Sequence, residues 1–410
     1  MKRIIKERKF KFDEYRSELP EKDQLLLDDF FEELDRHLSL DRDDGLCMKT
    51  DFEAAIMYFD SIGLTLGETL ARLDVKNLGG FYARPPIVWF QLDDVAKLYP
   101  LSMKHGQMAV FRLSAYLKEE VVPEVLQMAL TFTIKRFPSF ATTVKKGFFW
   151  HYLDTSKKRY PVEEEKYIPC RPMNVSGSGS QSFRVLYYGN RVSAEFFHIL
   201  TDGTGGMVFL KTLLAEYLRL LGKLGADAAK TAAPVDYQIL DINQMPPATE
   251  LISSLPESDE VGKLTAFVDK PALQFSGKLS KLRMSKILHF KLDAAGLREA
   301  AREEGCTVTA YILTQLFIAG RYATDEYSGE MNIQVPVNLR QYYPSETMRN
   351  FFMCCGIRIP VETIDSACAA GRTAGAAATD NAAGRTAGAA ATDNAAGRTA
   401  GAASGTDAAD

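Results

Sequence analysis

The stretch "EFFHILTDGTGG", Glu195–Gly206, sets this chain apart. Apolar alternation through Val192–His198 predicts a β-strand that ends on the histidine, with His198 on the apolar face. Asp202 follows four residues later, and three glycines lie among the next four positions. Glycine has no side chain, so backbone can approach a ligand closely there. A neutral imidazole in this position suits a general base, although most histidines in folded proteins are structural.

Composition sets broad limits on function. The chain has 410 residues, 46% hydrophobic and 25% charged, which is typical of a globular protein with room for two domains. A net charge of −4 gives no electrostatic case for nucleic acid. The charged start lacks the apolar core of a signal peptide, and no run is long enough for a membrane-spanning helix. Six scattered cysteines without a CxxC pair argue against a zinc site or a disulfide framework, so we expect a cytoplasmic protein without a metal or permanently bound cofactor.

The pattern of periodicity changes several times along the chain. The first part has helical spacing, for example at Leu25, Leu26, Phe30, Leu34 and Leu38. Strands then alternate with helices in two separate blocks, which predicts an α/β or α+β two-layer sandwich in each half. We expect a helical extension over 1–84, a first sandwich domain over 85–225, a linker or crossover over 226–280, a partial second domain over 281–365 and a low-complexity tail over 366–410.

The predicted tail is a repeat. "AAGRTAGAAATDN" occurs at 369–381, recurs at 382–394 and begins again at 395. No large apolar side chain follows residue 368, so nothing would offset the conformational entropy lost on ordering. We therefore expect disorder from about Ser366 onward, and we interpret the repeat as a replacement of the natural C-terminus.

The segment "HILTDG", beginning at His198, resembles the HxxxDG motif of the chloramphenicol acetyltransferase-like superfamily. This superfamily includes alcohol acetyltransferases, plant-type acyltransferases, wax-ester synthases and condensation domains of nonribosomal peptide synthesis. The context supports the resemblance: a hairpin strand precedes the motif, an amphipathic helix follows it, and "VPVNLRQYYPSETMRNFF" comes downstream. In that last segment Pro336, Asn338, Arg340 and Asn350 stand in the family's order. The resemblance covers roughly Trp89–Pro360 and is nearest to bacterial alcohol acetyltransferase or condensation-domain proteins.

The resemblance implies roles for particular residues. Two chloramphenicol acetyltransferase-like domains would enclose a channel, with His198 at its centre as the general base. Asp202 would be a structural residue paired with an arginine, Arg340 in the first instance and Arg136 in the second. Gly203 would permit the tight turn between the strand and the following helix.

The resemblance also implies a reaction, and this sequence departs from the family in two places. The expected activity is transfer of an acyl group, such as acetyl, from acyl-CoA as co-substrate to an alcohol or amine. Condensation domains usually carry a second histidine where this chain has Phe197, which favours simple acyl transfer, with a carrier-protein donor as the other possibility. Family members continue beyond "IRIP" with elements that complete the second domain, whereas here the repeat follows. The competing hypothesis is therefore a non-catalytic binding or scaffold protein, or an inactive remnant of the fold.

Overall fold

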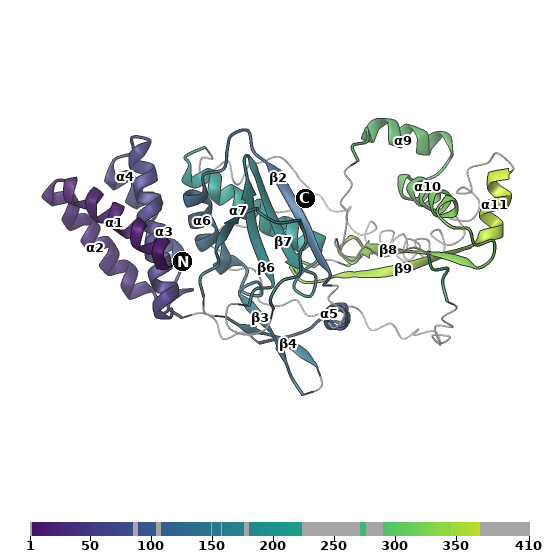
Figure 1. The fold of residues 1–410 in the computed structure, drawn as a ribbon, viewed down its shortest axis with the longest axis horizontal. Coiled ribbons are helices and arrows are strands. Elements are labelled where there is room, and N and C mark those ends of the chain that lie inside the picture. Colours follow the sequence, from purple (N-terminus) through teal and green to yellow (C-terminus); the bar gives the residue numbers. More distant parts are fainter. Residues whose placement is uncertain are drawn as a thin grey trace, which may run out of the picture. The chain divides into compact units, whose positions relative to one another are not determined.

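The computed structural model describes residues 2–84, 89–103, 108–148, 150–156, 158–175, 180–223, 271–275, 290–343 and 345–369. The chain divides into two compact units. The first is formed by Met1–Pro256 with Pro344–Phe351, and the second by Glu257–Tyr343 with Phe352–Asp410. Each unit combines helices with β-sheet (Figure 1), which confirms the predicted mixed α/β class.

Helices fill the predicted N-terminal extension. Asp41 caps one of them by accepting a hydrogen bond from the backbone N–H of Asp44, and Thr65 and Glu68 form a capping box at another. Gly63, at φ +87°, lies between these two helices, where the sequence predicted a break. The bounds are α1 Lys2–Glu18, α2 Glu21–His37, α3 Arg42–Ser61, α4 Leu66–Arg72 and the 3₁₀ turn η1 Val75–Leu78.

The buried face of α2 differs from the predicted one. Leu25 and Leu26 are 61% and 41% exposed, whereas Leu27, Phe30 and Leu34 are buried. The three buried residues lie three and four positions apart, so they share one side of the helix. Three consecutive leucines at 25–27 could not all face one core, and the sequence alone did not indicate which of them would.

The motif-bearing part of the first unit is a four-stranded sheet with order β2-β7-β6-β5. Its β6–β7 hairpin turns at Gly189, φ +52°, and Asn190, as the sequence predicted. Helices α6 and α7 pack against each other and against this sheet. The bounds are β2 Val110–Tyr116, α6 Pro123–Thr133, η3 Ile134–Arg136, β5 Val162–Glu164, β6 Phe183–Tyr188, β7 Arg191–Phe197 and α7 Gly203–Leu220.

A second sheet of the first unit has the order β1-β4-β3, with both pairs antiparallel. The turn residues Lys146-Gly147, between two apolar segments, predict the β3–β4 pair that is observed. Two short helical segments follow β1 and bring an aromatic residue, Tyr99, toward the motif strand. The bounds are β1 Trp89–Gln91, η2 Ala96–Leu98, α5 Tyr99–Met103, β3 Thr142–Lys146 and β4 His151–Thr155.

One hydrophobic core joins the N-terminal helices to the sheet. The rings of Phe52 on α3 and Phe132 on α6 lie 6.1 Å apart, and both side chains are fully buried. Phe140, Phe196 and Phe209 form the centre of the same core beneath the sheet. The helical extension is therefore an integral part of the first unit, and the composition change near residue 84 does not mark a boundary in the packing.

The second unit is a small helical layer beside an antiparallel pair of long strands. Among its described residues, seven form a buried core, and these include Phe317, Met331 and Ile357. The apolar segment SKILHFKLD predicts a strand over 285–293. Its described part, residues 290–293, is not a strand, and 285–289 lie outside the described residues. The bounds are α9 Ala294–Glu303, α10 Val308–Tyr322, β8 Glu330–Asn338, η5 Leu339–Gln341, β9 Phe352–Pro360 and α11 Val361–Ala369.

Residues 366–369 were expected to be disordered, but they are helical. Helix α11 runs through Ala369, and the Ser366 hydroxyl donates a hydrogen bond to the carbonyl of Glu362 within it. The rest of the predicted tail, and all of the predicted linker 226–280 apart from 271–275, lie outside the described residues. Within the described ranges, no helix combines the length and apolar character needed to cross a membrane.

Lys158 is a buried cation in the first unit. Its Nζ atom has no hydrogen-bond partner in the described structure and lies 5.7 Å from the centre of the Tyr160 ring. Burial lowers the pKa of Lys158 to about 8, and Asp44 opposes this shift. Because the folded-state pKa lies below the ordinary lysine value of 10.5, the unfolded chain binds more protons between these two values. Lys158 therefore makes folding less favourable below pH 8, and this penalty disappears as the pH rises toward 10.5.

We expect Lys158→Met to raise the free energy of unfolding at pH 7 and to have a much smaller effect at pH 10. The physical reason is that methionine fills the same space without a charge that must be desolvated. Urea unfolding of both proteins at several pH values measures the difference. If the effect of Lys158→Met on the free energy of unfolding does not change with pH, the pKa of Lys158 is not lowered by burial.

Candidate functional site

His198 follows directly after β7 and is held between two aromatic rings. Its backbone N–H donates to the carbonyl of Ala109, 2.9 Å away, which continues the β2–β7 pairing by one residue. Its imidazole stacks on Tyr99, with ring centres 4.8 Å apart and planes at 17°, and Phe111 lies 4.9 Å away on a tilted plane. The side chain is half-buried. Packing on the rings therefore fixes its plane.

Asn350 determines which imidazole nitrogen carries the proton. Its Nδ2 donates to the carbonyl of His198 at 2.9 Å and to Oδ2 of Asp93 at 3.4 Å, and both of these oxygens are acceptors. The other end of the amide, Oδ1, therefore faces Nδ1 of His198 at 3.1 Å. Because this oxygen can only accept, Nδ1 must carry the hydrogen. The neutral imidazole then has its lone pair on Nε2.

Asp93 and Arg349 support Asn350 from behind. Asn350 is 1% exposed, and the Arg349 guanidinium contacts Oδ2 of Asp93 at 3.5 Å while donating to the carbonyl of Gln91 at 2.5 Å. Burial raises the pKa of Asp93, and the charge of Arg349 counters part of this rise. Burial also lowers the pKa of Arg349, countered by Asp93. Asp93 and Arg349 thus form a buried ion pair in which each charge stabilises the other. This ion pair fixes the amide of Asn350, which orients His198.

Asp202 joins the motif to the segment 345–351, which belongs to the first unit. One carboxylate oxygen caps α7 by accepting from the backbone N–H of Gly205 at 3.0 Å, and the other accepts from the backbone N–H of Phe351 at 2.9 Å. The side chain is buried. Asp202 is therefore a structural residue. It holds the segment 345–351, which carries Asn350, beside His198.

The arginine partner expected for Asp202 stays a prediction. Arg340 lies on η5 of the second unit, where its backbone N–H donates to Oδ1 of Asn338 at 3.1 Å. Arg136 lies on η3 in the first unit and is 2% exposed. The described contacts of Asp202 include the two backbone amides of Gly205 and Phe351.

Gly205, and not Gly203, is the glycine that the fold requires. A Cβ atom on Gly205 would lie 2.2 Å from the carbonyl oxygen of Met348 and 2.3 Å from the Thr201 hydroxyl. That hydroxyl donates to the same carbonyl at 2.5 Å. Gly203 has no neighbour within 4 Å of its Cβ position and no positive φ, so the structure does not support the predicted role of Gly203 in the turn. Close approach of the 345–351 backbone explains the requirement at position 205.

We expect Gly205→Ala to lower the free energy of unfolding by about 1–3 kcal/mol or more, the usual cost of overpacking a rigid site. Backbone lies against the new methyl group, so the whole segment carrying Asn350 must move. Gly203→Ala is the matched control, expected to be neutral or slightly stabilising because alanine favours helix. Urea unfolding of the two variants makes the comparison, and equal effects would refute the contact between Gly205 and Met348.

Several residues of the site were not identified as such from the sequence. Asn350 was noted only for its place in the downstream segment, and Asp93 and Tyr99 lie about a hundred residues before the motif without any local signal. In the described portion of the chain, no three His, Cys, Asp or Glu side chains are grouped as metal ligands would be. The site is thus a single imidazole oriented by neutral and charged polar side chains.

Comparison with known proteins gives structural neighbours only. No family model and no curated protein matches the sequence. Similar solved structures include polyketide synthase associated protein 5 from Mycobacterium tuberculosis, at 14% identity over 68% of this chain and 71% of that one, with a TM-score of 0.43. The first condensation domain of the calcium-dependent antibiotic synthetase, with a substrate analogue, is 14% identical over 69% and 73%, with a TM-score of 0.44. The X-domain from teicoplanin biosynthesis is 14% identical over 67% and 66%, with a TM-score of 0.42.

Proposed function

We propose that this chain is an acyltransferase that moves an acyl group from a thioester to an alcohol or amine, with His198 as the general base. The observation that carries the proposal is the hydrogen-bond chain Asp93–Asn350–His198. In this chain a buried amide fixes the tautomer of a half-buried imidazole at the end of a strand. Here the amide leaves Nε2 as the basic nitrogen, which is the protonation state that general-base catalysis uses.

The reaction follows from that tautomer. The acceptor's oxygen or nitrogen attacks the thioester carbonyl carbon while Nε2 of His198 takes its proton. The tetrahedral intermediate then collapses, the carbon–sulfur bond breaks, and the imidazolium returns the proton to the departing sulfur. The products are an ester or amide and a free thiol. In this scheme the protein supplies one proton relay and a fixed orientation, and the acyl group never bonds to the protein.

For the donor we propose acyl-CoA, with acetyl as the first acyl group to test. Phe197 occupies the position before His198 and is fully buried in the core. That position therefore cannot supply a second polar group at the reacting centre. A carrier-protein thioester is the second donor to test, and Arg340 is proposed as a structural residue near the site.

A non-catalytic binding or scaffold role is the competing proposal, and the second unit gives the reason. Its aromatic and apolar side chains include Leu316 at 52%, Tyr322 at 81%, Tyr327 at 75% and Met353 at 54% exposed. Apolar surface of this kind is typical of a protein–protein contact.

An assay of thiol release separates the two roles. The full chain is incubated with acetyl-CoA and a panel of alcohols and amines, and the free thiol is followed with a chromogenic disulfide. Acyl transfer predicts thiol release that depends on both the acceptor and the protein. If neither CoA nor carrier-bound thioesters are consumed with any acceptor, while the chain binds a protein partner, the scaffold role holds.

A further inference from the structure

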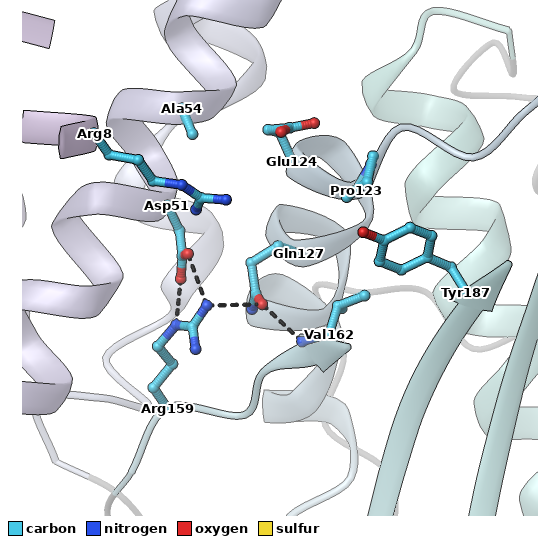
Figure 2. A pocket seen from close by; sticks show the side chains of 9 residues that line it. All are labelled: Arg8, Asp51, Ala54, Pro123, Glu124, Gln127, Arg159, Val162 and Tyr187. Carbon is cyan, nitrogen blue, oxygen red and sulfur yellow. Dashed lines mark hydrogen bonds and ion pairs between the residues drawn. The ribbon is translucent and has the colours of Figure 1, made fainter. Parts of the chain in front are cut away.

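A small polar cavity lies where the N-terminal helices meet the sandwich of the first unit (Figure 2). It has a volume of about 90 Å³ and shares no residue with the His198 site. Its walls come from α1, α3 and α6, from the loop before β5, and from β5 and β6. The lining residues are Arg8, Asp51, Ala54, Pro123, Glu124, Gln127, Arg159, Val162 and Tyr187.

The floor of the cavity is a closed hydrogen-bond network. Nε and Nη2 of Arg159 donate to the two carboxylate oxygens of Asp51, at 2.5 and 2.8 Å. Nη2 of Arg159 also donates to Oε1 of Gln127 at 3.0 Å, and the same oxygen accepts from the backbone N–H of Val162 at 2.8 Å. Asp51 and Gln127 are 4% and 5% exposed. Asp51 and Gln127 are therefore already satisfied, and they form a rigid base.

Three other side chains face the cavity with hydrogen-bonding capacity to spare. Figure 2 shows the guanidinium of Arg8, the carboxylate of Glu124 and the hydroxyl of Tyr187 around the space above the floor. Among the described residues, none of these three side chains makes a hydrogen bond, and no ion pair joins Arg8 to Glu124. A positive and a negative group thus face one space from different helices without contacting each other.

We propose that this cavity binds a small zwitterion, an α-amino acid of the size of glycine or alanine. Its carboxylate would accept hydrogen bonds from Arg8 and Tyr187, and its ammonium group would donate to Glu124. Arg8 and Arg159 balance Asp51 and Glu124, so a ligand with no net charge preserves neutrality, whereas a simple anion or cation would not. Charge-assisted hydrogen bonds of this kind are stronger than neutral ones.

The volume agrees with a ligand of this size. An engineered cavity of about 150 Å³ accommodates benzene, and a polar cavity of this kind otherwise fills with ordered water. A space of about 90 Å³ with Arg8 exposed at its mouth admits an ammonium carboxylate with a small side chain. Larger amino acids would have to extend past Arg8, so we expect affinity to fall with side-chain size.

Calorimetric titration of the full chain with glycine and L-alanine tests the proposal. We expect saturable binding, and we expect acetate and methylammonium, which each carry one of the two charges, to bind at least tenfold more weakly. Arg8→Gln and Glu124→Gln should each weaken alanine binding by about tenfold to a hundredfold, the equivalent of one charge-assisted hydrogen bond. Lys11→Gln, an exposed change on the same helix, is the matched control and should leave affinity unchanged.

Circular dichroism and thermal unfolding of each variant establish that it is folded before it is titrated. The proposal is overturned if neither amino acid binds the folded wild-type chain. It is also overturned if acetate binds as tightly as alanine, which would make the cavity an anion site. Equal alanine affinity in Arg8→Gln, Glu124→Gln and the control would place the binding elsewhere in the molecule.

Discussion

Replacing His198 with alanine is expected to lower the kcat of acyl transfer by about 10²–10⁴-fold, the contribution of a positioned general base. The substitution removes Nε2, the nitrogen that would take the acceptor's proton. It also removes a ring that packs on Tyr99 and Phe111. Steady-state thiol release with saturating acyl-CoA measures the effect.

Two further variants show whether the loss is chemical. His37→Ala changes a histidine on α2 whose ring bonds to the carbonyl of Glu33, and it should leave kcat unchanged. Asn350→Ala keeps the imidazole but removes the hydrogen bond that fixes its proton on Nδ1. The kcat should therefore fall by a smaller factor than in His198→Ala. Turnover near the wild-type value in a folded His198→Ala protein would show that another base performs the transfer.

Replacing Glu195 with alanine is expected to lower the free energy of unfolding of the first unit by about 3–5 kcal/mol, the cost of breaking a buried ion pair. Glu195 is fully buried in the middle of β7. Strand register places it directly opposite Arg112 on β2 and Arg184 on β6. Nε of Arg112 donates to Oε1 at 2.8 Å and Nε of Arg184 donates to Oε2 at 2.6 Å, so the variant leaves two guanidinium groups without their shared carboxylate.

The neighbouring contacts of Glu195 strengthen this expectation. The backbone N–H of Cys170, at φ 57°, also donates to Oε1 of Glu195, at 2.8 Å. Glu165 forms ion pairs with Arg112, which it shares with Glu195, and with Arg191. Burial alone would raise the pKa of Glu165, but the two arginines lower it. Removing Glu195 therefore loosens a covering loop as well as a pair of strands.

Glu164→Ala supplies the matched control for Glu195. Glu164 lies on β5, half exposed, and forms a surface ion pair with Lys166 at 3.0 Å. Surface pairs contribute roughly 0–1 kcal/mol, so this variant should unfold almost as the wild type does. Urea unfolding followed by circular dichroism compares the two. A loss below about 1 kcal/mol for Glu195→Ala would mean that the arginines find solvent or other partners after relaxation.

Local sequence signals predicted most of the elements. Alternation through Val192–His198 predicted β7, the turn at Gly189-Asn190 predicted β6 as the hairpin partner of β7, and helical spacing after the glycines predicted most of α7. These signals depend on neighbours a few residues apart, so they act before any tertiary contact forms. The errors came where several apolar residues competed for one face, as in α2, or where a composition change did not coincide with a packing boundary.

The sequence by itself determined that His198 lies at the end of a strand, that Asp202 lies on the turn that follows, and that no large apolar side chain occurs after residue 368. Only the tertiary structure decided what these residues contact. The contacts involve segments that are far apart in the chain and carry Asn350, Asp93 and the two arginines that bind Glu195. No periodicity links these segments. The physical reason is that buried hydrogen bonds and ion pairs are selected by three-dimensional proximity and desolvation, which a linear pattern of neighbours does not specify.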